Sequence, residues 1–260
     1  EDPERSAGDA GAKIAAEKVG IIKPGSTVIT AVQLPEVAAQ IVARAAEVGA
    51  TVAREGLEFG VRSRVPAVGG QMLSLQGPRG RYDGLFLPLY GAHQGQNAAL
   101  ALAAVEAFVG GDEPLADEVV KDAFAEVTSP GRLEVIRRSP TIVLDAAHNP
   151  HGAAALVDAL EDSFVFSPLI GVVGVMADKD LAPILARIGP LIDRWYFTDL
   201  PTPRAAKAAD LLAAWQAQNK RTDASGSVHA SPMEALGAAI GQAGAADRIV
   251  VFGSFFTVGG

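Results

Sequence analysis

The chain has 260 residues, of which 49% are hydrophobic, and a formal net charge of −8. This length can bury a substantial core in one large domain or two ordinary ones, and the acidic balance argues against a general nucleic-acid-binding surface. No apolar run approaches the roughly 20 residues of a membrane span, no leader pattern opens the sequence, and the absence of cysteine excludes disulfides and thiolate metal sites. We therefore expect a soluble cytoplasmic protein that binds neither membranes nor nucleic acid.

The first half of the sequence predicts helices interrupted by short strands. Four helices are expected there, at residues 8–18, 34–50, 93–111 and 113–127. Pro35 suits the first turn of the second helix, and Gly49 suits its C-terminal cap. A buried-type strand is expected at 26–32, and short alternating pieces separated by Gly and Pro predict a small antiparallel patch between Thr51 and Leu89.

Beyond residue 127 the pattern changes to alternating strands and helices. The segment 128–134, TSPGRLE, combines Ser, Pro and Gly and is the candidate hinge. Five apolar strands are expected after it, at residues 141–147, 169–176, 194–200, 227–230 and 247–255. A helix follows each of the first four strands, and the fifth closes the chain. The order predicts an α/β protein whose residues 128–260 form a Rossmann-like domain with a mostly parallel sheet.

The turn after the strand at 141–147 concentrates polar side chains. Asp145 ends this strand, His148 and Asn149 follow, and a helix begins near Pro150. In open α/β sheets ligands gather at the carboxyl ends of strands, and the amino end of a helix favours anions. The same residues can equally cap the helix while the histidines lie on the surface, so the residues alone leave both interpretations open. No Ser elbow or Cys accompanies them, and a catalytic triad is not supported.

Several stretches together resemble the folylpolyglutamate synthases and dihydrofolate synthases of the Mur ligase superfamily. They are EKVGIIKPGSTVIT, YGAHQGQNAALALAAVEAF, GRLEVI with TIVLDAAHNPHG, GVMADKD and VVFGSFFTV. These stretches follow the family's order and span nearly the whole chain, and Mur ligases proper usually carry other residues around the HNP turn. The resemblance implies that residues 1–127 form the tail of a P-loop-type central ATPase domain with a small β patch. Residues 128–260 would then form the C-terminal glutamate-binding domain.

The resemblance also implies a reaction. In this family a pterin-linked carboxylate attacks the γ-phosphate of ATP, and the amine of L-glutamate then displaces phosphate from the acyl phosphate. The substrates implied are L-glutamate with dihydropteroate, a reduced folate or both, the cofactors are ATP and Mg²⁺, and the family inclines to monomers. Such chemistry depends on phosphate binding, metal and positioning more than on a covalent nucleophile.

Two candidate residues of the first half take their roles from the resemblance. Lys18 matches the lysine that is carbamylated in this family, where the carbamate oxygens are hard ligands suited to Mg²⁺. Without the family, Lys18 would be interpreted as a solvent-facing lysine at a helix end. Asn97 matches the asparagine at the adenine region of ATP, and His93 lies one turn earlier on the same helix face. The alternative for His93, Gln94 and Asn97 is ordinary capping of an alanine-rich helix.

Two candidates in the second half match residues that bind the nucleotide. Arg132 matches the hinge-region arginine that reaches the ATP phosphates, whose oxygens a guanidinium can bind in pairs. Asp145 matches an aspartate that holds the nucleotide from the third domain. Arg132 alone would be interpreted as a surface arginine, but its pairing with Asp145 and the HNP turn favours the functional interpretation.

The remaining candidates concern glutamate. His148 matches a histidine near the incoming glutamate, and Ser254 is a second candidate there, although Gly-Ser after a strand is commonly only a turn. His151 replaces the Asp or Asn frequent at its position in the family and receives no role. His229 is interpreted as a strand-edge histidine.

Two features of the family are missing from the sequence. No G-x-x-x-x-G-K-[ST] loop is present, because GDAGAK at 8–13 has the wrong spacing and is followed by Ile14. The family's metal-binding histidine before the lysine helix is not recognisable in residues 1–9. Because the chain also begins without methionine and stops just after an apolar strand, we expect a C-terminal fragment that does not turn over alone.

Two other functions are compatible with the same residues. One is an amino-acid ligase of cell-wall or cyanophycin type within the same superfamily. The other is a non-catalytic module that binds a nucleotide or a folate.

Overall fold

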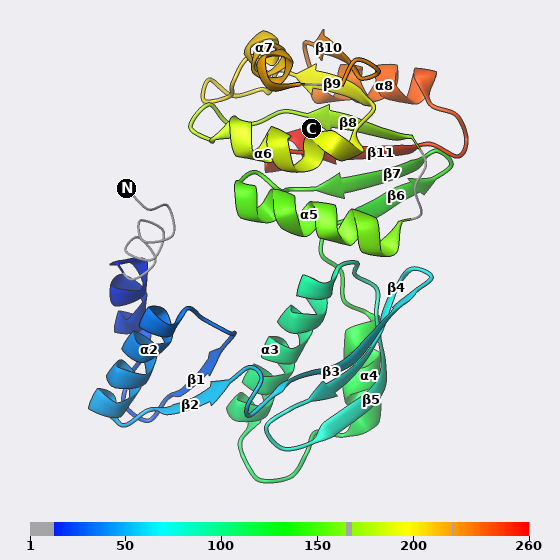
Figure 1. The fold of residues 1–260 in the computed structure, drawn as a ribbon. Coiled ribbons are helices and arrows are strands. Elements are labelled where there is room, and N and C mark those ends of the chain that lie inside the picture. Colours follow the sequence, from blue (N-terminus) through cyan, green and yellow to red (C-terminus); the bar gives the residue numbers. More distant parts are fainter. Residues whose placement is uncertain (1–12, 165–167, 220, 260) are drawn as a thin grey trace. The chain divides into compact units, whose positions relative to one another are not determined.

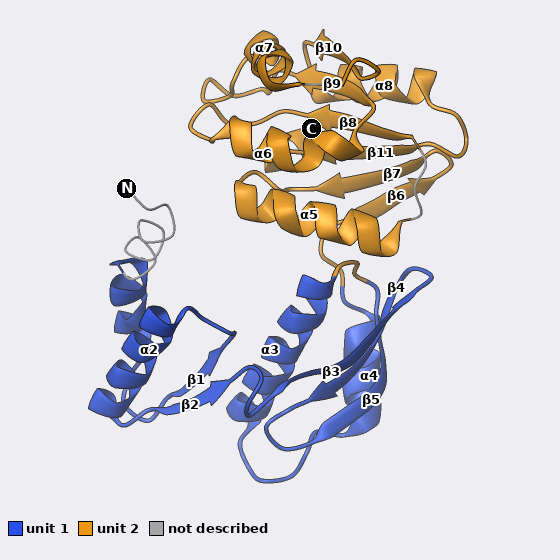
Figure 2. Cartoon of the chain, viewed as in Figure 1, with its two compact units in different colours: residues 1–88, 92–127 blue, residues 89–91, 128–260 orange. Residues whose placement is uncertain are grey.

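The computed structural model describes residues 13–164, 168–219 and 221–259. The chain separates into two compact units (Figure 2). Unit 1 comprises residues 1–88 and 92–127, and unit 2 comprises residues 89–91 and 128–260. Each unit is described below by itself.

The N-terminal part of unit 1 is a small parallel layer (Figure 1). Strand β1 (Thr27–Thr30) pairs in parallel with β2 (Thr51–Arg54), and helix α2 (Pro35–Val48) connects them. Pro35 occupies the first turn of α2, and Gly49 ends it with a left-handed φ of 68°, which confirms both predictions. Residues 13–18 are helical and lead into the short 3-10 turn η1 (Val19–Ile21). The predicted helix at 8–18 lies partly outside the described residues.

Two expectations for this layer were wrong. The strand expected to be buried at 26–32 is shorter and only partly buried, because β2 is its single described partner. Residues 51–54 were expected in the antiparallel patch, but they run parallel to β1. The 14-residue helix between the strands explains the difference, since a helical crossover returns the chain in the same direction.

The rest of unit 1 is an antiparallel sheet covered by two helices. The sheet has the order β3 (Gly60–Ala67), β4 (Gly70–Gln76), β5 (Arg81–Leu87), and the helices are α3 (Ala92–Val109) and α4 (Asp117–Ala125). The buried side chains Leu73, Leu75, Leu85 and Leu87 form much of its core. Gly110 and Gly111, both with positive φ, end α3 as the sequence predicted.

A buried polar cluster ties this sheet to both helices. The Tyr82 hydroxyl donates to Glu106 Oε1 at 2.6 Å and accepts from the Leu115 N–H at 2.8 Å, just before α4. The Arg79 N–H donates to the other Glu106 oxygen at 3.0 Å. Burial and the bond to Glu106 raise the pKa of Tyr82 to about 12. The cluster therefore fixes α3 and α4 against β5.

Unit 2 is built on one six-stranded sheet of order β10-β9-β8-β11-β7-β6 (Figure 1). The strands are β6 (Glu134–Arg138), β7 (Thr141–Asp145), β8 (Leu169–Val173), β9 (Arg194–Thr198), β10 (Ser225–His229) and β11 (Arg248–Phe252). All neighbours are parallel except the β6–β7 pair. The predicted Rossmann-like, mostly parallel sheet is confirmed.

Helices cover both faces of this sheet. They are α5 (Pro150–Ser163), α6 (Leu181–Ile188), η2 (Gly189–Leu191), α7 (Ala208–Gln218), α8 (Pro232–Gln242) and α9 (Phe255–Val258). Side chains of α5, α6 and α7 pack with Trp195 and Phe197 in one core, and α8 packs with Ile170 and Tyr196 in another. The alternation of successive strand residues between the two cores is what a sheet covered on both faces requires. The chain does not close on β11 as expected, because α9 follows it.

Among the described residues, no helix combines the length and the apolar character needed to cross a membrane.

Candidate active-site residues

Asp145 connects the end of β7 to the loop that precedes β6. The residue is 7% exposed. One carboxylate oxygen accepts from the Leu133 N–H at 3.0 Å, and the other accepts from the Ala147 N–H at 2.8 Å. Burial raises the pKa of Asp145, against the opposing effect of these two donors and of the Arg132 charge. Asp145 thus acts as a brace, which means here that its carboxylate links the loop before β6 to the turn after β7. Asn149 in the same turn caps α5 by accepting from the Gly152 N–H at 2.7 Å.

The loop braced by Asp145 has an unusual backbone. Gly131 and Leu133 have positive φ values of 68° and 49°, and the Leu133 side chain is buried. The Ala146 N–H donates to the Gly131 carbonyl at 2.8 Å, and the Gly131 N–H donates to Glu134 Oε2 at 2.8 Å. These bonds hold the backbone on both sides of Arg132.

The Arg132 side chain is exposed and lies over an aromatic ring. Its Cζ atom is 5.3 Å from the centroid of the Phe255 ring. Among the described residues of unit 2, no acceptor takes a hydrogen bond or forms an ion pair with this guanidinium. Its N–H donors therefore stay available for an anion.

His148 is partly buried in the turn after β7. Its Nδ1 atom lies 2.8 Å from the Ala146 carbonyl oxygen. Because a carbonyl can only accept, Nδ1 carries the proton in this contact, which leaves Nε2 for another partner. His151, by contrast, is exposed in the first turn of α5.

Ser254 occupies the start of α9 at the carboxyl end of β11. Its side chain is 5% exposed, and its oxygen accepts from the Phe256 N–H at 3.1 Å. Gly253 before it has a φ of 111°, and a Cβ there would lie 2.5 Å from the Gly174 carbonyl oxygen. The sequence suggested a plain turn as the alternative for Ser254, whereas the structure gives it a capping role whose hydroxyl proton can still be donated.

Two residues of α9 escaped the sequence analysis. Phe255 carries the ring under Arg132, and the buried Thr257 hydroxyl donates to the Gly174 carbonyl at 2.6 Å. The only sequence signal was the pair of aromatics after Ser254, and nothing local linked either of them to Arg132.

The candidates of unit 1 lie on two elements. Lys18 is exposed at the end of the helical residues 13–18 and lines a mainly apolar cavity of about 460 Å³. Among the described residues, no group of three His, Asp or Glu side chains could hold a metal ion. Asn97 is exposed on α3, where its amide donates to the buried Gln94 at 3.2 Å.

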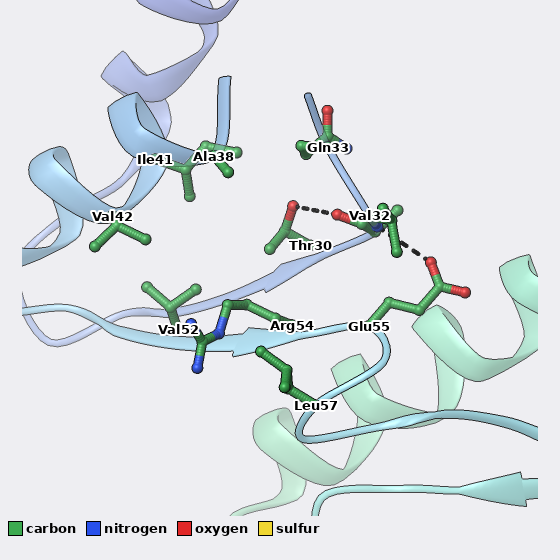
Figure 3. Close-up of a pocket in the computed structure, with 11 residues that line it drawn as sticks. Thr30, Val32, Gln33, Ala38, Ile41, Val42, Val52, Arg54, Glu55 and Leu57 are labelled. Atoms are coloured by element: carbon green, nitrogen blue, oxygen red, sulfur yellow. Dashed lines mark hydrogen bonds between the residues drawn. The ribbon is translucent and has the colours of Figure 1, made fainter. Parts of the chain in front are cut away.

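A second, smaller cavity lies at the carboxyl ends of β1 and β2 (Figure 3). It measures about 150 Å³, and Ile41, Val42 and Val52 supply apolar walls. Glu55 at its rim accepts from the Val32 N–H at 3.2 Å, as the dashed line in Figure 3 marks. Arg54 is paired with Glu58 at 2.8 Å. The sequence analysis did not single out this cavity, and its lining carries no set of groups arranged for catalysis.

The chain is similar to known proteins along most of its length. Residues 131–255 match the family described as Mur ligase, glutamate ligase domain. The chain is 46% identical over 211 residues to the dihydrofolate synthase/folylpolyglutamate synthase of Mycobacterium tuberculosis, an alignment that covers 78% of this chain and 43% of that protein. It is 33% identical over 245 residues to the Escherichia coli protein of the same name, covering 94% of this chain and 53% of that protein.

Solved structures agree with these relatives. The Mycobacterium tuberculosis folylpolyglutamate synthase complexed with ADP matches with a TM-score of 0.87 at 40% identity, over 95% of this chain and 57% of that chain. Escherichia coli FolC in complex with DHPP and ADP matches with a TM-score of 0.80 at 31% identity, over 95% of this chain and 55% of that chain. The chain spans about half the length of these proteins.

Proposed function

Because the chain belongs to the Mur ligase superfamily, on the branch of the folylpolyglutamate and dihydrofolate synthases, we propose that the gene product containing it catalyses ATP-dependent addition of L-glutamate to dihydropteroate, a reduced folate or both. The observation that carries this proposal is the identity with the Mycobacterium tuberculosis protein. The aligned segment is longer than either compact unit, so the similarity extends into both. Residues 1–127 would belong to the central ATPase domain and residues 128–260 would bind glutamate.

The nucleotide proposal rests on three residues. Two relatives are described in complex with ADP, which supports ATP as the phosphoryl donor here. Arg132 offers uncommitted guanidinium donors to the phosphates, and Asn97 would contact the adenine region. Each oxygen of Asp145 accepts one backbone N–H and retains a lone pair, so this carboxylate can accept from a ligand while it braces the loop.

The glutamate proposal rests on the turn after β7 and the start of α9. His148 has Nε2 free of the bond that orients its ring, and Ser254 can still donate its hydroxyl proton. Attack of the glutamate amine on an acyl phosphate needs no protein nucleophile. These residues would therefore bind and orient glutamate rather than react with it.

The described residues around Lys18 do not fit a magnesium site. Lys18 as an ammonium repels a cation, and its surroundings in the cavity are mainly Ile, Val, Leu and Ala. A carbamate on Lys18 would supply oxygen ligands, but the described residues place no carboxylate or imidazole cluster beside it.

The cysteine-free sequence is consistent with a reducing compartment, for which we propose the cytoplasm, and we propose a monomer. The sequence given contains no P-loop motif, so the 260-residue chain by itself is expected not to turn over.

A ligation assay tests the function. The full gene product is incubated with ATP, L-glutamate and either dihydropteroate or tetrahydrofolate, and the glutamylated product is detected by mass. R132A and H148A should lower kcat/KM strongly, whereas H151A, at an exposed histidine only three positions from His148, should not. Turnover of UDP-muramoyl peptides instead would favour a cell-wall ligase. ATP binding without any ligation would favour a non-catalytic module.

A further inference from the structure

Among the described residues of unit 2, the side chain that lies against the guanidinium of Arg132 is an aromatic ring. The Phe255 ring lies 5.3 Å below it, and no described carboxylate of this unit pairs with it. A carboxylate partner would neutralise the charge and occupy the donors that an anion needs. A ring face attracts the cation and leaves every N–H in the guanidinium plane free.

The Phe255 ring belongs to α9, a short helix that is held at both ends. Phe255 is the first residue of α9, directly after the Ser254 cap. The Thr257 hydroxyl ties the same helix to the carbonyl of Gly174 beyond β8. A Cβ at Gly131 would lie 3.3 Å from Val258, so the other end of α9 meets the loop of Arg132 itself. Helix α9 therefore contacts both the residue that follows β8 and the loop that carries Arg132.

The Arg132 backbone is held by hydrogen bonds of its two neighbours. Asp145 accepts from Leu133, and Gly131 accepts from Ala146, so the residues flanking Arg132 are bonded to the turn after β7. The backbone of Arg132 and the ring beneath its guanidinium are therefore both held in place, and only the methylene groups between them remain flexible. A ring contact that limits this flexibility lowers the ordering cost of anion binding.

We propose that Phe255 is a positioning residue that preorganises Arg132 for the phosphates of the nucleotide. The proposal rests on the proposed function, since it assumes that Arg132 binds those phosphates. Phe255 acts through Arg132 and need not touch the ligand.

The test compares ADP affinity by calorimetry in variants of the full gene product. F255L removes the ring but keeps an apolar side chain, and because Phe255 is 56% exposed the substitution should leave the fold intact. We expect about two- to fivefold weaker ADP binding, the usual size of an exposed cation–π contact. F255W should restore or improve the affinity. The matched control is F256L, at the neighbouring exposed ring, over which no cation of the described residues lies, and it should bind like wild type.

A double-mutant cycle separates positioning from a general structural effect. In an R132Q background, F255L should cause no further loss, because the ring has no guanidinium to hold. An equal loss in both backgrounds, a wild-type affinity of F255L, or an F255W as weak as F255L would each overturn the proposal. Wild-type ADP affinity of R132Q, or no ADP binding by the unmodified gene product, would instead overturn the proposed nucleotide function and this inference with it.

Discussion

Replacing Asp145 by alanine tests whether this carboxylate is a structural brace. The substitution leaves the buried N–H groups of Leu133 and Ala147 without their acceptors. Each unpaired buried donor costs about 1–3 kcal/mol, and relief from burying a carboxylate, whose pKa is raised by desolvation, offsets part of the sum. We expect D145A to lower the free energy of unfolding of unit 2 by about 2–4 kcal/mol.

Urea denaturation followed by tryptophan fluorescence measures this change, because both tryptophans of the chain, Trp195 and Trp215, lie in unit 2. The control is D158A, which removes an exposed aspartate whose partner Arg187 lies 3.1 Å away, and it should cost less than about 1 kcal/mol. If the free energy of unfolding of D145A lies within about 0.5 kcal/mol of that of D158A, the structural role of Asp145 is refuted. Asp145 would then have to be explained by ligand binding alone.

The raised pKa of Asp145 adds a pH dependence with a definite sign. Since the folded pKa lies above the unfolded one, the native state takes up the proton first as the pH falls. The free energy of unfolding of wild type relative to D145N should therefore increase as the pH is lowered through this raised pKa. A difference that shrinks on acidification contradicts the assignment of burial as the cause of the shift.

Three further predictions concern the scaffold. Y82F should destabilise unit 1 by about 2–4 kcal/mol, because it removes a bond to the buried carboxylate of Glu106 and leaves the partly buried Leu115 N–H without its acceptor. Hydrogen exchange over α3 and β5 measures this change. The control Y196F, which loses only a 3.1 Å bond to Gln242, should cost about 1 kcal/mol. With a pKa of about 12 against a reference value of 10.0, Tyr82 should make wild type lose stability relative to Y82F between pH 10 and 12, since the native state keeps the proton longer; a constant difference would contradict this. G253A should cost more than about 2 kcal/mol by urea denaturation, since its φ of 111° and the Gly174 carbonyl leave no room for a methyl group, whereas G237A, in a helix with open space, should be neutral or stabilising.

Local sequence signals predicted much of the fold. Pro35 and Gly49 delimit α2 because each acts through its own backbone conformation. The alternation of apolar strands with helices after residue 127 was enough to predict a mostly parallel sheet. The partner of residues 51–54 was missed, because the direction of pairing depends on the path of the chain between two strands rather than on either strand.

The candidate site, like the fold, could be predicted from local sequence signals only in part. A polar turn after β7 could be predicted, since Asp145 and His148 adjoin an apolar strand. The bond from Leu133 to Asp145 could not, because it requires a left-handed conformation in a residue that rarely adopts one. The contact between Arg132 and Phe255 joins the two ends of unit 2 and has no signature in either segment. Four-residue α9 is too short to show a helical period.

Two edge strands, β6 and β1, differ in how readily they could pair with a strand of a second chain. In unit 2, the edge strand β6 runs antiparallel to β7 and carries the exposed residues Arg137 and Arg138. These charges discourage strand pairing between molecules. In unit 1, β1 has the uncharged sequence TVIT and one described partner. Self-association of the 260-residue chain at high concentration should therefore begin at β1. The V28K substitution, which places a charge on this strand, should reduce that self-association.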